Sequence, residues 1–204
     1  MITRIYDYFQ SLILDLFIAG QRNRKTLLFF GKNKLYTKNG KINILKGYFH
    51  FNKSFRKPEP NSGFLEIGKN AEINVAGDFS IYNGGHVVIM DNAKLNLGSG
   101  YINRNTKIRC FNEITIGQQV AISENVSIWD SDAHQILRDD YKPTAPIKIG
   151  NHVWIGTNSV ILKGVTLGDG CIVAAGSIVN KSFPAKCLIG GIPAKIIKEN
   201  IVWK

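Results

Sequence analysis

The sequence predicts an all-β fold, a parallel β-helix built from hexapeptide repeats, with a helical segment at its N-terminus. The first observation is a period of six. From Ile149 onward every sixth residue is aliphatic, through Ile155, Ile161, Leu167, Val173 and Val179. This period fits neither an α-helix nor a flat strand. It is typical of a solenoid in which three short strands and three turns make one triangular coil of about 18 residues.

The second observation is a row of small or β-branched residues in the same register. Four places behind the aliphatic positions stand Val153, Ser159, Val165, Cys171 and Ser177. A triangular coil has a narrow interior, so we expect the aliphatic residues on its sides and the small residues inside its corners. Glycine and asparagine tolerate a positive φ, and they cluster around the expected corners, for example at Gly156, Asn158 and Gly164.

The extent of the solenoid follows from the same pattern in a looser form. Earlier members of the series are Ile67, Ile73, Phe79, Val88, Leu95, Ile108, Ile114, Val120 and Val126. A coil cannot bury its core alone, so several must stack. We predict a solenoid over residues 60–195, enough for about seven coils. Residues 1–59 are predicted to be a helical and linker segment, and residues 196–204 a C-terminal tail.

The N-terminal segment carries most of the positive charge. The chain has a net charge of +11, and residues 1–60 contribute +9 of it. Apolar residues at helical spacing come first: Ile2, Ile5, Phe9, Leu12, Ile13 and Leu16. Two interpretations stay open. The helix caps the end of the solenoid, or residues 1–45 make a peripheral membrane contact through an apolar face and a basic stretch. No aromatic and basic platform indicates nucleic acid.

Composition favours a cytoplasmic location. No stretch approaches the roughly 20 apolar residues of a membrane span, and no signal-peptide cleavage pattern is present. The three cysteines are odd in number and scattered, at Cys110, Cys171 and Cys187. We interpret them as reduced thiols. We therefore expect a cytoplasmic protein, with the membrane contact of residues 1–45 as the open question.

The regular repeat breaks once, between residues 130 and 146. A break of this kind is typically a loop on one face of a solenoid, where function is found. Within it lies His134, flanked by Asp130, Asp132 and Arg138. Histidine titrates near neutrality, so an exposed imidazole held by a neighbour can accept a proton and return it. We predict that this loop is the active-site loop.

Four segments give the chain a family resemblance. They are Asp-x-His at Asp132–His134, PIKIGNHVWIG at Pro146–Gly156, VAAGSIVNKSFP at Val173–Pro184 and GGIPAKIIK at Gly190–Lys198. In order and spacing they resemble the left-handed β-helix acyltransferases, in particular the maltose/galactoside acetyltransferase-like and polysaccharide O-acetyltransferase branch. The resemblance implies a left-handed coil, a homotrimer, and active sites in clefts between subunits.

The resemblance also implies a reaction. His134 matches the catalytic base, which would take the proton of an acceptor hydroxyl while that oxygen attacks the thioester of acetyl-CoA. Because a thioester is already activated, direct transfer without a covalent intermediate is expected. Asp132, Asp130 or a backbone carbonyl would orient the imidazole, and backbone N–H groups near Gly156 would meet the oxyanion.

Further positions match cofactor contacts of that family. Trp154 lines the cleft near the thioester and the acceptor, and Gly156 lies in the coil turn that follows it. Thr157 meets the pantetheine arm, and Ala175 leaves room for it. The remaining matches are Asn180, where the family often has threonine, and the two basic residues Lys195 and Lys198, which would meet the CoA phosphates.

The acceptor side matches less well. Asn103 and Arg138, together with Trp154, are the candidate acceptor contacts. Where galactoside-type enzymes carry an acidic pair, this chain has Cys110 and Phe111. We therefore expect a sugar of a surface polysaccharide rather than a free galactoside. Two alternatives stay open: N-acetylation of an amino-sugar nucleotide, and a non-catalytic β-solenoid that serves as a binding module.

A metal site is not expected. A carbonic anhydrase class with this fold binds zinc through three histidines, two of them close together on adjacent turns. In this chain His86, His134 and His152 stand far apart in the sequence. We predict no metal and no cofactor other than acetyl-CoA as co-substrate.

Overall fold

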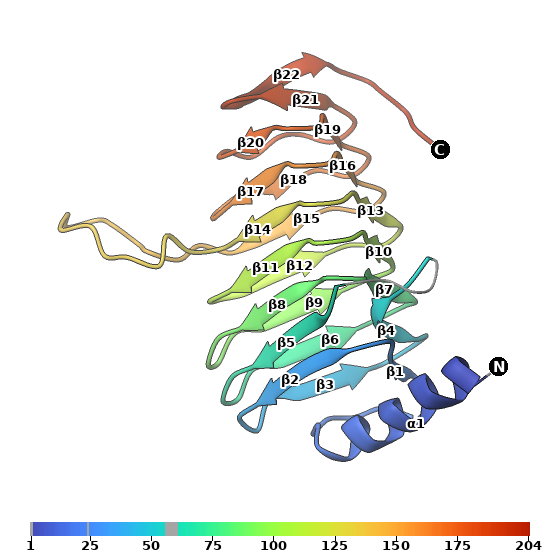
Figure 1. The fold of residues 1–204 in the computed structure, drawn as a ribbon. Helices are drawn as coiled ribbons and strands as arrows, with labels where there is room; N and C mark the ends of the chain where they lie inside the picture. The colour runs from blue at the N-terminus through green and yellow to red at the C-terminus, as the bar shows by residue number, and fades with distance from the viewer. Residues whose placement is uncertain (1, 24, 56–60) are drawn as a thin grey trace.

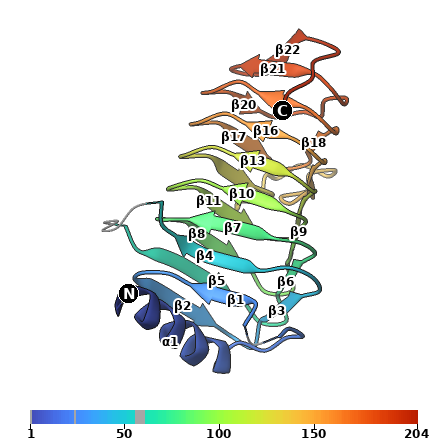
Figure 2. The ribbon, with the colours of Figure 1, turned by 90° about the vertical axis from the view of Figure 1, so that its right-hand side faces the viewer.

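The computed structural model describes residues 2–23, 25–55 and 61–204, and it forms a parallel β-helix (Figures 1 and 2). One helix, α1 (Ile2–Leu16), precedes the strands. From β1 to β20, successive strands pass to three sheets in turn, so that every third strand returns to the same sheet one coil further along. No helix in the described ranges is long and apolar enough to cross a membrane. The predicted all-β class with an N-terminal helix is confirmed.

The nine-stranded sheet runs the whole length of the solenoid. Its strands are parallel except for the last pair, β21 and β22, which is antiparallel. In spatial order the sheet contains β1 (Leu27–Phe29), β4 (Phe49–Lys53), β7 (Phe79–Tyr82), β10 (Gly100–Ile102), β13 (Val120–Ile122), β16 (Trp154–Ile155), β19 (Ile172–Val173), β21 (Leu188–Gly191) and β22 (Ala194–Lys198).

The other two sheets complete the triangle. The seven-stranded sheet contains β2 (Asn33–Thr37), β5 (Gly63–Ile67), β8 (His86–Ile89), β11 (Lys107–Cys110), β14 (Ser127–Trp129), β17 (Val160–Leu162) and β20 (Ile178–Val179). The six-stranded sheet contains β3 (Lys41–Ile44), β6 (Glu72–Val75), β9 (Lys94–Leu97), β12 (Glu113–Ile116), β15 (Ile147–Ile149) and β18 (Thr166–Leu167).

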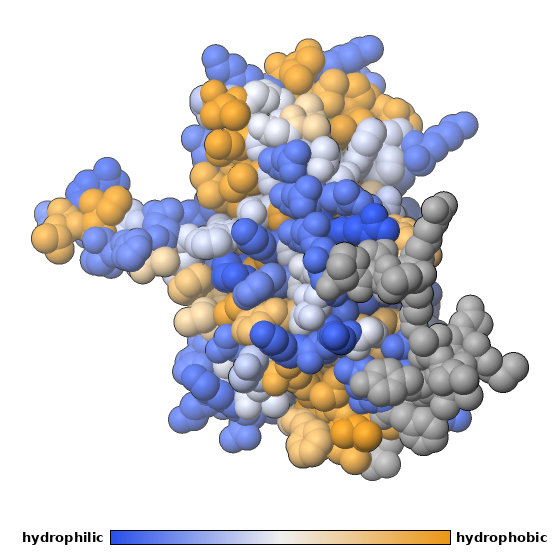
Figure 3. All heavy atoms as spheres, in the orientation of Figure 1, coloured by the Kyte–Doolittle hydropathy of each residue, from blue (hydrophilic) through white to orange (hydrophobic). Residues whose placement is uncertain are grey.

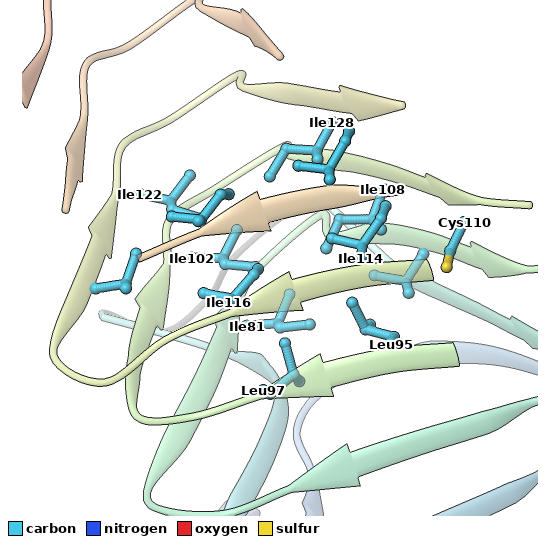
Figure 4. Close-up of a cluster of buried hydrophobic side chains, with 14 of the residues drawn as sticks. Ile81, Leu95, Leu97, Ile102, Ile108, Cys110, Ile114, Ile116, Ile122 and Ile128 are labelled. Atoms are coloured by element: carbon cyan, nitrogen blue, oxygen red, sulfur yellow. The ribbon is translucent and has the colours of Figure 1, made fainter. Parts of the chain in front are cut away.

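The core is a column of aliphatic side chains from all three sheets. Figure 4 shows its middle section, where side chains of β7 to β14 point toward one another. Inward and outward residues alternate along each strand, as in β12, where Ile114 and Ile116 are buried. The predicted interior series from Ile149 to Val179 is buried throughout. The period of six therefore identified the inward-facing positions correctly from Ile149 to Val179. Val88 of the earlier series was assigned wrongly: it faces outward, because its neighbours Val87 and Ile89 fill the core.

The solenoid begins earlier than residue 60, where we expected it to start. Strand β1 already pairs in parallel with β4, so residues 27–53 form a coil and not a linker. Leu27 pairs with Phe49 in this first coil, whereas Trp154 pairs with Ile172 in a late one, so the first coil is the longer of the two. Its extra length and its phenylalanine interior hide the period of six, which explains why the sequence did not reveal this coil.

Both ends of the solenoid are covered. Figure 1 shows α1 across the N-terminal end, next to β1. The N–H of Phe29 in β1 donates to the hydroxyl of Ser11, at 2.8 Å, and the N–H of Gly31 donates to Asp7 Oδ1, at 3.0 Å. The β21–β22 hairpin closes the other end. Covering both ends removes exposed strand edges that would otherwise pair with other chains.

Candidate functional site

Two corners of the triangular coil carry the predicted site residues. Corner I comprises the turns that lead from the nine-stranded to the seven-stranded sheet, at residues 103–106, 123–126, 156–159 and 174–177. Corner II comprises the turns that lead from the seven-stranded to the six-stranded sheet, including the long loop at residues 130–146. The seven-stranded sheet separates the two corners within one chain.

Corner I holds most of the predicted cofactor contacts. Trp154 begins β16 with 42% of its surface exposed, and its indole N–H donates to Ser123 Oγ at 3.3 Å. Thr157 follows in the next turn, where its hydroxyl donates to the Glu124 carbonyl at 2.8 Å. One coil further on, Ala175 is exposed at the same turn position. These residues form a continuous row, because neighbouring strands of a sheet lie about 4.8 Å apart.

Close stacking explains the small residues of this row. A Cβ added to Gly156 would lie 2.6 Å from the backbone nitrogen of Ala175. The third turn residue adopts a positive φ in successive coils, at Asn125 (58°), Asn158 (59°) and Gly176 (70°). Asparagine and glycine adopt this conformation readily. Corner I is therefore a narrow backbone ridge with few protruding side chains.

Corner II carries His134 on the long loop. The loop leaves the solenoid between β14 and β15 and extends far from the coil, as Figure 1 shows. Its neck is closed by an antiparallel bridge between Ser131 and Thr144. His134 is exposed, and its imidazole has no hydrogen-bond partner among the described residues. Leu137 near the tip is 97% exposed. The loop thus holds its imidazole and an apolar tip away from its own solenoid.

Asp132 is held at the base of this loop by two other residues. Lys163, one coil further on, donates to Asp132 Oδ2 at 2.6 Å, and the Tyr141 hydroxyl donates to the same oxygen. The hydrogen bonds from Lys163 and then Tyr141 lower the pKa of the Asp132 carboxyl. Lys163 also donates to the Lys142 carbonyl at 2.6 Å. Asp132 therefore anchors the loop, and the Asp132–His134 contact that we expected is not formed in this chain.

Asp130 also lies elsewhere than expected. Its side chain is buried and accepts hydrogen bonds from the backbone N–H groups of Phe111, at 2.6 Å, and Asn112, at 2.8 Å. Burial raises the pKa of the Asp130 carboxyl, although these N–H groups lower it. Cys110 lies beneath, with its Sγ 3.9 Å from Asp130 Oδ2, and it too is buried. Asp130 thus ties two coils together and does not reach the His134 imidazole.

The remaining predicted cofactor residues lie apart from corner I. Asn180 follows β20 at corner II, and Lys181 beside it has its ammonium 5.6 Å from the centroid of the Phe183 ring. Lys195 and Lys198 are exposed on β22, opposite Gly190 and Leu188 of β21. Within a single chain, Asn180 therefore lies at the same corner as the His134 loop. Thr157 and Ala175 lie at the other corner, across the seven-stranded sheet.

The predicted acceptor residues are also divided between the two corners. Asn103 lies at corner I, where its side-chain oxygen accepts from the backbone N–H of Arg104 at 2.8 Å. Arg138 lies on the loop at corner II and pairs with Asp140 at 2.8 Å. Both members of that pair are largely exposed, so the pair contributes little to stability. The acceptor set, like the cofactor set, is therefore not brought together by one chain.

Sequence reasoning missed three residues near the site. Lys163 and Tyr141 fix the loop base, and their contacts cross from one coil to the next. Lys163 directly precedes Gly164, whose N–H donates to the carbonyl of Ala145 at the end of the loop, at 3.0 Å. The third is Trp203, which stacks on His152 with centroids 4.0 Å apart and lies 6.0 Å from Trp154. The tail thus returns to the row of corner I.

The described residues contain no cluster of three or more histidine, cysteine or carboxylate side chains that could hold a metal ion. His86 lies on the seven-stranded sheet and His134 on the loop. The His152 Nε2 is 2.9 Å from the Trp203 carbonyl. The three histidines that we compared with a zinc site therefore lie on different parts of the solenoid.

The sequence matches a family model described as the hexapeptide repeat of succinyl-transferase, over residues 146–181. Galactoside O-acetyltransferase of Escherichia coli strain K12 is 37% identical over 139 residues, which cover 67% of this chain and 64% of that protein. The chain thus spans slightly less than two thirds of the length of this relative.

Two further matches cover a larger share of the matched protein. WbbJ of Escherichia coli strain K12, assigned by its name to O-acetyl transfer in lipopolysaccharide biosynthesis, is 30% identical over 68% of this chain and 74% of its own length. The crystal structure of the polySia specific acetyltransferase NeuO is similar with a TM-score of 0.52 and 25% identity, over 91% of this chain and 86% of NeuO. The predicted left-handed parallel β-helix agrees with these matches.

Proposed function

Because the chain belongs to the hexapeptide-repeat acyltransferases, we propose that it is an acetyl-CoA-dependent O-acetyltransferase that acts on a sugar hydroxyl in surface polysaccharide biosynthesis, in the cytoplasm. The observation that carries the proposal is the pairing of two features. A narrow row with Trp154, Thr157 and Ala175 offers a path for a pantetheine arm, and the one long loop of the described solenoid presents an exposed His134.

The proposed reaction needs one base and one activated donor. His134 accepts the proton of the sugar hydroxyl as that oxygen attacks the thioester carbon of acetyl-CoA. The carbon–sulfur bond then breaks, and the imidazolium returns the proton to the CoA thiolate. Such acid–base assistance is worth about 10²–10⁴-fold in rate. No nucleophilic side chain is required, so the acetyl group passes directly to the sugar.

The oxyanion of this reaction needs a donor that is free. The N–H of Gly156 already donates to the Val173 carbonyl at 2.8 Å, so it is occupied. The N–H of Thr157, next along corner I, has no acceptor within the part of the chain that the structure describes. We assign the oxyanion contact to Thr157, because a fixed backbone donor stabilises developing charge without reorganisation.

A complete site requires two copies of the chain. His134 and Asn180 belong to corner II, and Trp154, Thr157 and Ala175 to corner I. If the seven-stranded sheets of several copies face one another, corner I of one copy meets corner II of the next. Three copies close such a ring as a homotrimer. The outer face of this sheet supports the arrangement, since it carries the apolar side chains Phe64, Val88, Trp129, Val160, Leu162 and Ile178.

Two unpaired polar atoms on the same face also support this assembly. Within the described ranges, Nδ1 of His86 and Nε1 of Trp129 are buried without a hydrogen-bond partner. Buried polar atoms in folded proteins nearly always have a partner. By contrast, the outer face of the six-stranded sheet carries a satisfied ladder of Asn43, Asn74 and Asn96, with N···O distances of 2.9 and 3.0 Å. The outer face of the six-stranded sheet therefore suits contact with water, whereas that of the seven-stranded sheet suits contact with another chain.

The test is the release of free CoA from acetyl-CoA with a panel of sugar acceptors. His134→Ala is expected to lower turnover by about 10²–10⁴-fold. Gln135→Ala, an exposed neighbour on the same loop, is the matched control and is expected to keep its activity. Turnover of His134→Ala equal to that of the unsubstituted protein would remove the mechanism. Mild alkali distinguishes the product class, because it cleaves an O-acetyl ester and leaves an N-acetyl amide intact.

A further inference from the structure

Among the side chains that the structure describes, helix α1 buries polar residues against the solenoid and leaves Ile13 and Leu16 exposed, while Leu14 packs against the core. The side chains of Ile2, Ile5 and Phe9, which belong to the predicted apolar series, lie outside the described residues. Asp7, Ser11 and Asp15, spaced four residues apart on one face, are all buried. On the outer side, Leu16 is 68% exposed and Phe17, just after the helix, is 70% exposed. Ile13 is likewise exposed, at 56%. A helix that only covered a core would show the opposite arrangement, with its apolar stripe inward.

The inverted arrangement has a local cause. Strand β1 is the first strand of its sheet, so its outer backbone groups need partners that another strand would otherwise supply. Ser11 and Asp7 bind the backbone at Phe29 and Gly31. Asp15 forms a buried ion pair with Arg22, at 2.6 Å. These polar contacts, together with the packing of Leu14 on the core, hold α1 in place, and Ile13, Leu16 and Phe17 remain exposed.

The charge around this apolar face has one sign. From residue 16 to residue 55 the sequence contains no aspartate or glutamate. The two acidic residues of α1, Asp7 and Asp15, face inward. The first coil and the segment before it expose a set of lysines: Lys25, Lys32, Lys34, Lys38, Lys41 and Lys46. In the part of the chain that the structure describes, the N-terminal end therefore combines exposed apolar side chains with a set of exposed lysines.

We propose that this end of the solenoid docks onto an anionic membrane surface. Lysines are attracted to anionic headgroups, each contributing about 1 kcal/mol near the surface, while apolar side chains of an interfacial helix enter the headgroup region. Figures 1 and 2 show α1 lying across the end of the solenoid. Ile13, Leu16 and Phe17 are spaced three and four residues apart, so these exposed side chains lie on one side of the chain and can meet a flat surface together. Figure 3 shows hydrophobic atoms over the C-terminal half of α1 at this end.

Membrane docking goes beyond the proposed catalysis and does not depend on it. If the chain is a trimer, all three helices lie at the same end, and three weak contacts add to a stronger one. The docked enzyme would then work beside a membrane, within reach of a saccharide acceptor carried on a lipid.

Vesicle flotation tests the proposal with the full-length chain. The vesicles contain phosphatidylcholine alone, or phosphatidylcholine with phosphatidylglycerol as the anionic lipid. We expect flotation with the anionic vesicles only, and less of it at high salt. Leu16→Ser/Phe17→Ser removes the apolar contact and is expected to weaken vesicle affinity by about tenfold or more. Lys34→Gln/Lys38→Gln is expected to weaken it by about tenfold and to reduce its salt dependence.

Val202→Ser is the matched control, because Val202 is a comparably exposed apolar residue, at 83%, near the other end of the chain. It is expected to float like the unsubstituted protein. Circular dichroism and thermal unfolding of each variant separate loss of binding from loss of fold. Two results would overturn the proposal: an unsubstituted protein that fails to float with anionic vesicles, and a folded Leu16→Ser/Phe17→Ser variant that floats equally well. A change of oligomeric state in that variant, without vesicle binding by the parent, would instead assign the face to a second copy of the chain.

Discussion

The first coils and the last coils of the solenoid reach the same architecture with different sequences. In the first coils the strands have three to five residues, and phenylalanines fill the interior: Phe29, Phe49, Phe51 and Phe79. In the last coils, from β16 to β20, the strands have two or three residues, and the interior holds Ile, Val and Leu. The early coils have room for large rings, whereas the late coils fit one aliphatic residue per side.

The early and late coils also differ in how regular their lengths are. The late coils have a constant length, because Trp154 pairs with Ile172 and Val160 pairs with Ile178 at the same sequence separation. Their turns therefore stack in register and give corner I its even row, which an extended ligand such as pantetheine needs. The early coils vary in length. Helix α1 lies against them, and they contain none of the predicted cofactor contacts. The proposed cofactor binding thus falls in the second half of the solenoid, and the proposed membrane docking in the first half.

The largest expected effect concerns the early core. Phe51→Ala removes a fully buried ring and should lower the free energy of unfolding by about 3–5 kcal/mol. Because coils of a solenoid contact only their neighbours, the KM for acetyl-CoA should stay unchanged at temperatures where the protein is folded. Thermal unfolding and acetyl-CoA kinetics on the same sample measure both values. If Phe51→Ala raised the KM for acetyl-CoA as well as lowering stability, cofactor binding would depend on the early coils, and the proposed division of roles would be wrong.

Ala175→Trp tests the late half in the opposite sense. The exposed side chain at corner I has space in the free protein, so the unfolding temperature should hardly change. The indole would fill the path of the pantetheine arm, and the KM for acetyl-CoA should rise about 100-fold, which corresponds to about 2.7 kcal/mol. Lys148→Trp, at an exposed position of the six-stranded sheet, controls for the added bulk. Unimpaired acetyl-CoA binding by Ala175→Trp would show that the cofactor lies elsewhere.

A smaller effect is expected at the base of the loop. Lys163→Met removes the partner of Asp132 and of the Lys142 carbonyl. His134 should then be held less well, and kcat should fall about tenfold with the KM for acetyl-CoA unchanged. Lys148→Met, which removes an exposed lysine from the six-stranded sheet, is the control. Equal kcat values for the two variants would mean that the loop does not need this anchor.

The smallest of the four effects is a dependence of assembly on pH. Burial, followed by the nearby Arg109 guanidinium, lowers the pKa of the His86 imidazole below its ordinary value of 6.5. The folded and assembled protein thus favours neutral His86. Stability that depends on it should be present above about pH 6.5 and be lost as the pH falls below that value. Sedimentation should show a trimer that weakens on acidification, and His86→Gln should remove this dependence.

The difference between early and late coils also explains which parts of the fold could be predicted from the sequence. The series from Ile149 to Val179 located the late coils because each side admits one aliphatic residue. The first coil escaped because Phe49 and Phe51 follow no period of six. The loop at residues 130–146 could be predicted because it interrupts the repeat. The contact between Lys163 and Asp132 that holds its base could not, because it joins residues of different coils.

The orientation of α1 could not be predicted from its amphipathic pattern. Helical spacing of apolar residues ordinarily places them against a core. Here the unpaired backbone of β1 needed polar partners, and Ser11 and Asp7 supply them. The spacing therefore identified the helix, whereas the tertiary contact decided which face it buries.

In the proposed site, the loop of one copy acts on the corner I row of another. Co-expression of His134→Ala and Ala175→Trp chains with two different affinity tags tests this directly. At acetyl-CoA concentrations well below the KM of the unsubstituted protein, each variant alone should release CoA at about 1% of the parental rate or less. In a mixed trimer, the loop of an Ala175→Trp chain meets corner I of a His134→Ala chain once around the ring, so trimers purified through both tags should regain about one third of the sites. Mixed trimers that remain as inactive as either parent would contradict the shared site, because both residues would then serve the same site from one chain.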